Sequence, residues 1–163
     1  MLEIGGGIGQ VLLELLKADA STGEVVELVP SYEEHVRALA TEAGLVDRAS
    51  FRTADLVADV EARREADIVV LNKVVCCTPD GPELAGIAAA LTRRTLVLSF
   101  PRDDWWARAA FGTINGFLRL RRGSFRVFVH STASLRGPAE AHGLTLVSER
   151  TGPLFRIAAF ERA

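Results

Sequence analysis

The first half of the chain alternates short apolar runs with stretches in which apolar residues recur at helical spacing. Apolar runs bounded by turn residues predict buried strands, and recurrence at i, i+3 and i+4 predicts amphipathic helices. We expect strands over 2–4, 24–29, 50–54, 67–71 and 95–100. Between them we expect helices from about residue 10, over 31–43 with Gly44 as the stop, and over 83–91. This alternation is typical of βαβ units that build a parallel sheet.

After Pro101 the pattern changes to an aromatic-rich, roughly helical stretch that ends in the basic run RLRRGSFR. It predicts an insertion at about 102–130 on the substrate side, packed over the end of the sheet. A helix over 131–142 follows, and strands over 144–150 and 154–160 flank the turn residues Thr151, Gly152 and Pro153. We therefore expect an α/β fold: a Rossmann-like, doubly wound, mostly parallel sheet with a C-terminal antiparallel hairpin, in three αβα layers.

Composition narrows the possible partners. The 163 residues are 48% hydrophobic and 25% charged, which suits one globular domain with a sizeable core. A formal net charge of −2 creates no field that would attract nucleic acid, so we expect a small-molecule ligand. No apolar run approaches the roughly 20 residues of a membrane span, and no signal-peptide pattern opens the chain. These features predict a cytoplasmic protein.

The glycine-rich segment LEIGGGIGQ lies where the first strand meets the first helix. Glycine lets the backbone turn sharply and approach a ligand closely, and the following helix offers free N–H donors. The segment therefore predicts a nucleotide-like ligand. A dinucleotide fingerprint that starts at Gly5 would require glycine or alanine at position 10, where Gln10 stands. This spacing disfavours a nicotinamide-dependent oxidoreductase.

The same segment resembles the first motif of class I S-adenosylmethionine-dependent methyltransferases, an acidic residue followed by alternate glycines. The resemblance implies S-adenosyl-L-methionine as cofactor, S-adenosyl-L-homocysteine as product, and no metal. It further implies that Glu3 pairs with the methionine ammonium, directly or through water. The remaining cofactor contacts that it implies in this segment are Ile4, Gly5, Gly6, Gly7, Gly9 and Gln10.

Two further acidic residues follow the second and third expected strands. By the resemblance, Glu27 accepts hydrogen bonds from both ribose hydroxyls, with Leu28 beside it, and Asp55 receives the adenine amino group near the amide of Leu56. Acids after successive parallel strands converge at one edge of the sheet, where such folds bind ligands. The alternative is structural: solvated strand-end carboxylates, with Asp55 as the N-cap of a short helix.

The exit of the fourth strand, LNKVVCCTPD, lacks the Asn/Asp-Pro-Pro-aromatic element of enzymes that methylate exocyclic amines, since Lys73 follows Asn72. Asn72 is a candidate polar contact, or caps the next turn. Cys76 and Cys77 are adjacent, which suits neither a disulfide framework nor a zinc site. The alternative is a thiol nucleophile, as in enzymes that methylate carbon-5 of pyrimidines, although this stretch lacks their Pro-Cys setting. We expect both thiols to be reduced and to pack as small buried hydrophobes.

The insertion combines aromatic and basic residues that suit a flat hydrophobic anion. Trp105, Trp106 and Arg126 are therefore candidate acceptor contacts, although the aromatics could instead face the core and the arginines complement a helix C-terminus. From NKVVCC to FRVFVH the sequence is also similar to magnesium-protoporphyrin O-methyltransferases, which implies a propionate-like carboxylate as acceptor. For a hydroxyl acceptor His130 is the candidate base, with a structural contact as its alternative.

These observations predict methyl transfer from S-adenosylmethionine to a small-molecule acceptor, at a carboxylate or hydroxyl oxygen. A cofactor-binding module without turnover and an RNA methyltransferase are the alternatives, and a homodimer is left open. Met1 stands two residues before Glu3. The N-terminal helices of the resembling family are therefore expected to be absent.

Overall fold

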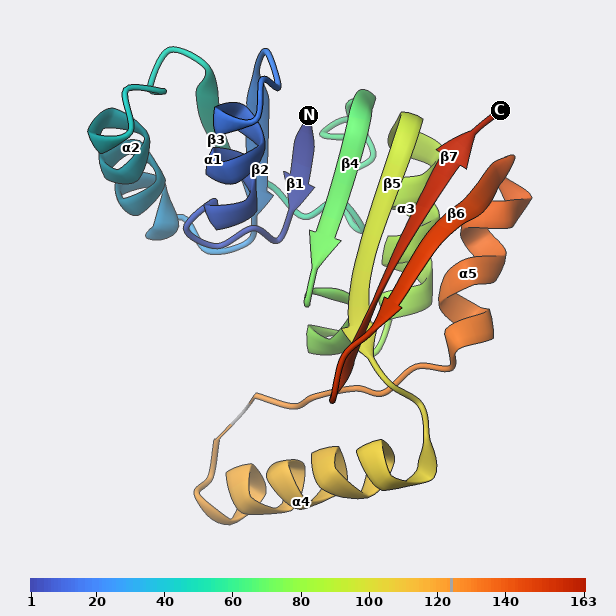
Figure 1. Cartoon of the computed structure of the whole chain (residues 1–163). Helices are drawn as coiled ribbons and strands as arrows, with labels where there is room; N and C mark the ends of the chain where they lie inside the picture. The colour runs from blue at the N-terminus through green and yellow to red at the C-terminus, as the bar shows by residue number, and fades with distance from the viewer. Residues whose placement is uncertain (124) are drawn as a thin grey trace.

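A computed structural model describes residues 1–123 and 125–163 of the chain. Its seven strands form a single sheet in the order β3-β2-β1-β4-β5-β7-β6 (Figure 1). The strands are β1 (Leu2–Ile4), β2 (Gly23–Glu27), β3 (Ala49–Thr53), β4 (Ala66–Asn72), β5 (Thr92–Pro101), β6 (Leu144–Thr151) and β7 (Phe155–Arg162). The helices are α1 (Gln10–Lys17), α2 (Tyr32–Glu42), α3 (Gly81–Leu91), α4 (Trp105–Leu120) and α5 (Thr132–Ala141), with a short 3-10 turn η1 (Val75–Cys77).

Strands β1 to β5 pair in parallel, and β7 lies antiparallel between β5 and β6. The expected doubly wound sheet with a C-terminal hairpin is confirmed. The strand boundaries differ modestly from the prediction: β5 begins at Thr92 rather than 95, and β2 ends at Glu27 rather than 29. Gly44 and Gly143 follow the ends of α2 and α5 with left-handed backbones at φ +68° and +75°, as expected of helix stops.

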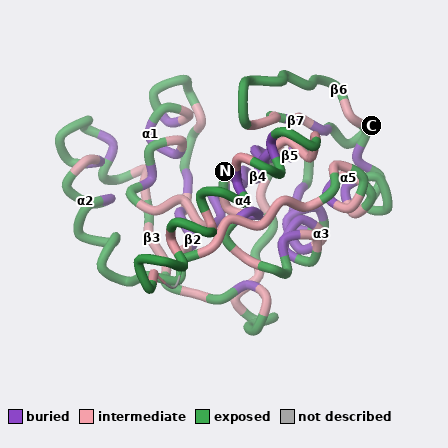
Figure 2. The backbone as a smooth tube through the Cα atoms, turned by 90° about the horizontal axis from the view of Figure 1, so that it is seen from below, coloured by how far each residue is buried: buried purple, intermediate pink, exposed green. Residues whose placement is uncertain are grey.

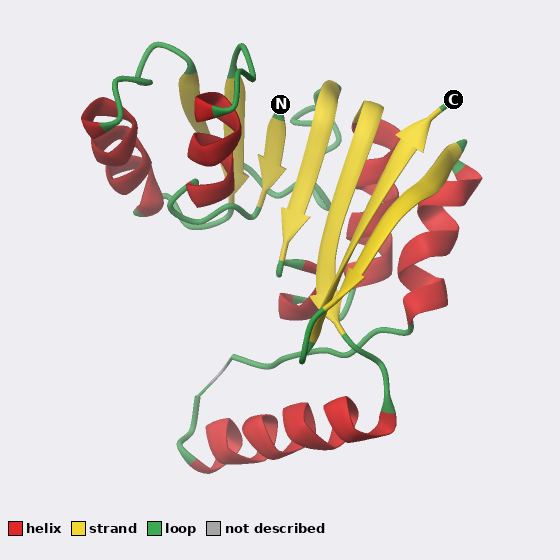
Figure 3. Ribbon diagram, viewed as in Figure 1, coloured by secondary structure: helices red, strands yellow, loops and turns green. Residues whose placement is uncertain are grey.

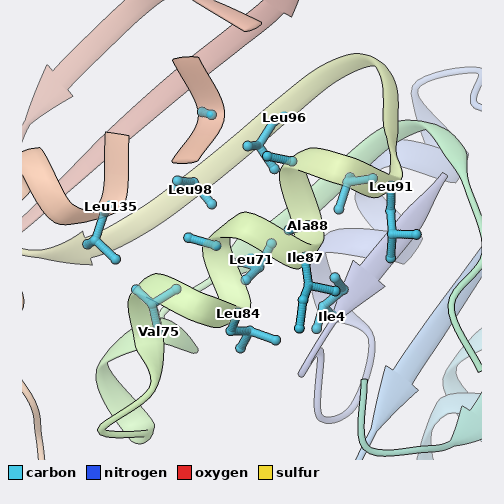
Figure 4. Close-up of a cluster of buried hydrophobic side chains, with 14 of the residues drawn as sticks. Ile4, Leu71, Val75, Leu84, Ile87, Ala88, Leu91, Leu96, Leu98 and Leu135 are labelled. Atoms are coloured by element: carbon cyan, nitrogen blue, oxygen red, sulfur yellow. The ribbon is translucent and has the colours of Figure 1, made fainter. Parts of the chain in front are cut away.

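Helices lie on both faces of the sheet, so the three-layer prediction is also confirmed (Figure 3). On one face, α1 and α2 cover β1 to β3, and Leu12, Leu16 and Val25 pack there. On the other face, α3 and α5 enclose a larger cluster that includes Ile4, Leu84 and Leu98. Figure 4 shows how the side chains of α3 meet those of β1, β4 and β5 in this cluster. Burying one such aliphatic side chain contributes about 1.5–3 kcal/mol relative to leaving it exposed.

Helix α4 lies outside these layers, across the carboxyl-terminal edge of the parallel strands (Figures 1 and 2). Two of its side chains are buried, Ala107 and Phe111, and the ring of Phe111 meets that of Phe155 edge to face at 5.9 Å. The predicted insertion at 102–130 thus contains α4 and the segment that returns from it to α5.

The insertion is fixed at its base and along its length by hydrogen bonds. The carboxylate of Asp103 accepts both the backbone N–H and the hydroxyl of Thr132 at 2.9 Å, which clamps the two ends of the insertion together. The amide side chain of Asn115 donates to the carbonyl of Val127 and accepts its N–H, both at 2.8 Å. The returning segment is therefore held against α4.

Candidate functional site

The loop between β1 and α1 depends on backbone conformations that favour glycine. Gly5, Gly7 and Gly9 have φ of +64°, +54° and +73°. A Cβ on Gly5 would also lie 2.7 Å from the side chain of Val74, whereas a Cβ on Gly7 would meet nothing within 4 Å. Gly5 is therefore required by packing as well as by conformation, and Gly7 presents bare backbone to open space.

Glu3 lies beneath this loop rather than in front of it. Its side chain is 2% exposed, and its Oε2 accepts the N–H of Leu12 in the first turn of α1 at 2.8 Å. A Cβ on Gly6 would lie 2.7 Å from the Glu3 carboxyl carbon. Burial raises the pKa of Glu3 to about 7, against the lowering effect of the backbone N–H groups of Leu12 and Val11. Glu3 therefore caps α1 and supports the loop, while its pairing with a ligand ammonium stays a prediction.

Glu27 connects the end of β2 to the glycine loop. Its Oε2 accepts the N–H of Gly7 at 3.0 Å, and its Oε1 accepts the N–H groups of Leu28 at 2.7 Å and Val29 at 3.4 Å. Both oxygens belong to a side chain that is only partly buried. Since each carboxylate oxygen has two lone-pair directions, one direction on Oε2 remains for a further donor while Glu27 holds the loop.

Asp55 lies just past the end of β3. Its Oδ1 accepts the N–H groups of Val57 and Ala58 at 2.9 and 3.3 Å, so it caps a turn. The structural alternative made Asp55 the N-cap of a short helix. No helix lies in the described segment between β3 and β4, so Asp55 caps a turn and not a helix. Its Oδ2 accepts no hydrogen bond from the residues that the structure describes, and the side chain is exposed. Asp55 therefore has one oxygen free to receive a donor.

These elements enclose a cavity of about 600 Å³ at the carboxyl-terminal edge of the sheet, a volume within the range of small-molecule sites. Seven of the predicted cofactor residues line it: Ile4, Gly5, Gly7, Glu27, Leu28, Asp55 and Leu56. A smaller hollow of about 320 Å³ between α2 and β3 contains none of the predicted residues. The first cavity is therefore the candidate cofactor site.

Five predicted cofactor residues lie outside the cavity lining: Glu3, Gly6, Gly9, Gln10 and Asn72. Gly6 covers Glu3, and Gly9 lets the loop pack on β2, since its Cβ would lie 3.2 Å from Val25. The side chains of Gln10 and Asn72 are exposed to solvent.

At the exit of β4 the sequence prediction named Asn72 and missed the residues that follow it. Lys73, Val74, Cys77 and Thr78 line the cavity, and Lys73 has a left-handed backbone at φ +60°. The ammonium of Lys73 lies 5.4 Å from the ring centroid of Phe155 and makes no ion pair with the described residues. The position of Lys73 directly after a parallel strand was the only signal in the sequence for this residue.

The two cysteines differ from one another. Cys76 is 4% exposed, which confirms the expectation of a buried thiol. For Cys77 that expectation was wrong, because its side chain is exposed and lines the cavity. The turn η1 directs adjacent residues to opposite environments, which no apolar pattern over two residues reveals.

The predicted acceptor contacts lie outside the cavity lining. Trp105 is 82% exposed, and the guanidinium of Arg102 lies 5.1 Å from the Trp106 ring. Arg126 donates to the carbonyl oxygens of Gly123 and Phe125, both at 2.8 Å, so it stabilises its own loop. The alternative was that the aromatic side chains of this insertion face the core. Phe111 is buried and fits that alternative, whereas Trp105 does not. The returning segment instead contributes Phe125 to the cavity.

His130 contacts η1 and is not among the residues that line the cavity. Its Nε2 lies 2.9 Å from the carbonyl oxygen of Val75 and 3.0 Å from that of Thr78. Because carbonyl oxygens only accept, Nε2 carries the proton and is engaged as a donor. The ring also stacks on Phe128 with centroids 6.3 Å apart. This geometry favours the structural role of His130 over that of a base.

Residues 1–123 and 125–163 offer neither a metal-binding cluster nor a membrane-spanning helix. No cluster of three or more His, Cys, Asp or Glu side chains in these ranges could hold a metal ion. Nor does any helix in them combine the length and apolar character that crossing a membrane would require.

Comparison with known proteins establishes the fold. No family model and no curated protein matches the sequence. Among solved structures, magnesium protoporphyrin IX methyltransferase from Synechocystis PCC 6803 with bound SAH matches with a TM-score of 0.79 at 20% identity, over 99% of this chain and 73% of that chain. An O-methyltransferase family protein from Burkholderia thailandensis matches with a TM-score of 0.80 at 22% identity, over 99% of this chain and 50% of that one. The [4+2]-cyclase SpnF matches with a TM-score of 0.71 at 11% identity, over 99% of this chain and 73% of that chain.

The chain thus has the class I methyltransferase fold, as the resemblance of its glycine motif predicted. It spans between about half and three quarters of the length of these structures. The cyclase shares the fold although its name describes a different reaction, so the chemistry of this chain has to be argued from its own residues.

Proposed function

We propose that this chain transfers a methyl group from S-adenosylmethionine to an oxygen atom of a small-molecule acceptor. The observation that carries the proposal is the cavity of about 600 Å³ in which the glycine loop, Glu27 and Asp55 meet. The shared fold supports it, since methyltransferases are among the structures that match over nearly the whole chain.

The cavity residues fit an adenosine-containing cofactor. Glu27 retains one acceptor direction, on Oε2, for a hydroxyl, and the free Oδ2 of Asp55 suits an exocyclic amine. Apolar side chains complete the walls and suit the faces of a purine ring; they include Leu28, Leu56, Val57 and Val74. The bare backbone of Gly7 lets a ligand approach the loop closely.

When bound, S-adenosylmethionine supplies a methyl group on a sulfonium that is already a good leaving group. The chain therefore needs mainly to hold cofactor and acceptor in line and to exclude water. Glu27 and Asp55 would fix the nucleoside end, and the loop over 5–7 would hold the methionine end. Glu3 would stabilise that loop from below through its bond to Leu12.

The acceptor group that the site suits best is a carboxylate. Lys73 brings a cation without an ion-pair partner among the described residues to the cavity wall at the end of β4. A carboxylate is already ionised at pH 7 and needs no base, and His130 has its Nε2 engaged with two carbonyl oxygens. A hydroxyl acceptor would need a base, and the side chain predicted for that role lies outside the cavity lining.

The test is an assay of S-adenosylhomocysteine formation with a panel of aromatic carboxylates and matching phenols. We expect product with carboxylates and markedly less with phenols near neutral pH. Failure of the protein to bind S-adenosylmethionine or S-adenosylhomocysteine in calorimetry would overturn the proposal.

A second candidate is a cofactor-binding protein without methyl transfer. The match to the [4+2]-cyclase SpnF favours this candidate, because that protein has the same fold and its name describes a reaction other than methyl transfer. Saturable cofactor binding without S-adenosylhomocysteine formation for any acceptor class would support this candidate over the first.

A further inference from the structure

Helix α4 exposes large apolar side chains along its whole length. Trp105 and Leu120, at its two ends, are each 82% exposed, and Phe117 is 54% exposed. Trp106 is less exposed, at 36%. Figure 1 shows α4 apart from the other helices, beyond the end of the sheet. Large apolar residues that gather on one exposed element, unlike single ones, indicate a surface that another body covers.

These four side chains lie on one side of the helix. At about 100° per residue they fall within an arc of about 120° around the helix axis. The other residues in this apolar arc are small and uncharged: Ala109, Thr113 and Gly116. The side chains that α4 buries, Ala107 and Phe111, lie on roughly the opposite side of the axis. The apolar arc therefore faces away from the body of the protein.

Arginine side chains border the apolar arc. By the same helical spacing, Arg119 and Arg121 each lie about 40° outside the arc, one on either side. Neither has a carboxylate partner among the described residues, and the guanidinium of Arg121 lies 4.7 Å from the Phe117 ring centroid. The stretch 105–126 contains five arginines and no aspartate or glutamate, in a chain whose formal net charge is −2. The helix thus combines an apolar face with a positive margin.

We propose that α4 docks on the surface of a phospholipid bilayer that contains anionic headgroups. The apolar arc enters the boundary between headgroups and acyl chains, and the helix axis lies parallel to the surface. Arg119 and Arg121 have side chains long enough to keep their guanidinium groups at the headgroup phosphates. Tryptophan favours the same boundary, which suits Trp105 and Trp106.

The charges decide between a bilayer and a second copy of the chain. Two copies that paired their apolar arcs would bring Arg119 and Arg121 of both copies to one interface, where like charges repel. The stretch 105–126 offers no carboxylate to pair with them. A nucleic acid would neutralise the arginines, but its phosphate backbone offers no apolar layer for Phe117 and Leu120. Anionic lipid matches both the arc and its margin.

The experiment uses the natural fluorescence of the helix. Trp105 and Trp106 are the only tryptophans of the chain, so their emission reports on α4 without a label. The cofactor-free protein is mixed with phosphatidylcholine vesicles that lack or contain about one third phosphatidylglycerol, and cosedimentation and emission are followed. With phosphatidylglycerol we expect binding at least tenfold stronger, emission at shorter wavelength, and quenching by lipids brominated on their acyl chains. Added salt should weaken the binding.

A first double variant tests the apolar arc. Trp105→Ala with Leu120→Ala removes its two most exposed side chains, places a strong helix former at both positions and retains Trp106 as the reporter. Binding to the anionic vesicles should fall at least tenfold. Val60→Ala with Val147→Ala is the matched control, because these exposed apolar residues lie outside α4, and it should bind as wild type does.

A second double variant tests the positive margin. Arg119→Gln with Arg121→Gln should remove most of the preference for phosphatidylglycerol and most of the salt dependence. Arg93→Gln with Arg94→Gln removes two exposed arginines of β5 and should leave both unchanged. Circular dichroism of each variant checks that the fold is kept.

Absence of vesicle binding, equal binding with and without phosphatidylglycerol, or binding that the α4 variants leave unchanged would overturn the proposal. A wild-type dimer in sedimentation velocity that Trp105→Ala with Leu120→Ala converts to a monomer would assign the arc to a second copy instead. Salt-dependent binding of single-stranded RNA without vesicle binding would assign the arginines to nucleic acid. None of these measurements needs S-adenosylmethionine, so their outcome is independent of the proposed function.

Discussion

The Oε2 atom of Glu27 lies 3.0 Å from the backbone nitrogen of Gly7, so the end of β2 and the glycine loop hold one another. The other oxygen of the same carboxylate bonds to the N–H of Leu28 at 2.7 Å. A loop that is already fixed loses less conformational freedom when a ligand binds, which favours affinity. Glu27 therefore organises the loop, and under the proposed function it also binds the cofactor.

The first prediction concerns Glu3. Its pKa rises from 4.5 in the unfolded chain to about 7 in the fold, so folding favours the protonated form. The contribution of Glu3 to stability is therefore greatest below pH 4.5 and is lost as the pH rises through 7. Glu3→Gln can still accept the N–H of Leu12 and avoids this loss. It should be more stable than wild type by up to about 3 kcal/mol at pH 8 and nearly equal at pH 4.

Chemical unfolding of both proteins across this pH range measures the difference. A stability difference that does not change with pH would contradict the burial of an ionisable Glu3.

The second prediction concerns the glycine that covers Glu3. Gly6→Ala would place a Cβ 2.7 Å from the Glu3 carboxyl carbon and 3.0 Å from its Oε2. We expect a loss of about 1–3 kcal/mol in the free energy of unfolding, because the buried carboxylate must move. Gly112→Ala is the matched control, since its Cβ meets nothing within 4 Å inside α4 and alanine favours helices. Urea unfolding should separate the two, and equal stabilities would show that Glu3 does not pack beneath Gly6.

The third prediction concerns the clamp of the insertion. Asp103→Ala removes both hydrogen bonds to Thr132, so the base of the insertion should loosen. We expect limited proteolysis to cut within 102–131 several times faster, with a loss of about 1–2 kcal/mol in global stability. Asp47→Ala, at an exposed position between α2 and β3, is the control. Unchanged cleavage of the insertion would argue that other contacts hold it.

The fourth prediction separates the acceptor from the cofactor. Lys73→Gln removes the cation from the end of β4, so the KM for a carboxylate acceptor should rise about tenfold while S-adenosylhomocysteine affinity changes less than twofold. Lys17→Gln, on the exposed surface of α1, is the control. Steady-state kinetics and calorimetry provide the two readouts. An unchanged KM would remove Lys73 from the acceptor site.

Seven of the residues that the sequence analysis expected around a cofactor line the cavity, because this part of the cavity depends on local chemistry. Positions 5 and 7 have a left-handed backbone, which favours glycine. Glu27 and Asp55 follow parallel strands, whose carboxyl ends meet at one edge of the sheet. Strand alternation also accounts for Glu3: Leu2 and Ile4 belong to the cluster under α3, so the residue between them faces α1.

The acceptor side could not be predicted from pattern alone. The direction of the Lys73 side chain follows from an unusual φ of +60° at a non-glycine residue. Helix α4 has the spacing of a core helix, yet it lies beyond the sheet edge, so Trp105 and Phe117 have no layer to pack against. Arg126 was expected to contact an acceptor, but its guanidinium donates hydrogen bonds to two carbonyl oxygens of its own loop.

The central claim is that the cavity beside Glu27 binds S-adenosylmethionine, and titration calorimetry with S-adenosylhomocysteine tests it most directly. Wild type and Glu34→Ala, which removes an exposed glutamate of α2, should bind with equal affinity. Glu27→Ala should bind about 10–100-fold more weakly, because charge-assisted hydrogen bonds to the ligand and the support of Gly7 are both lost. Absence of binding by wild type, or equal affinity of Glu27→Ala and wild type, would contradict the account.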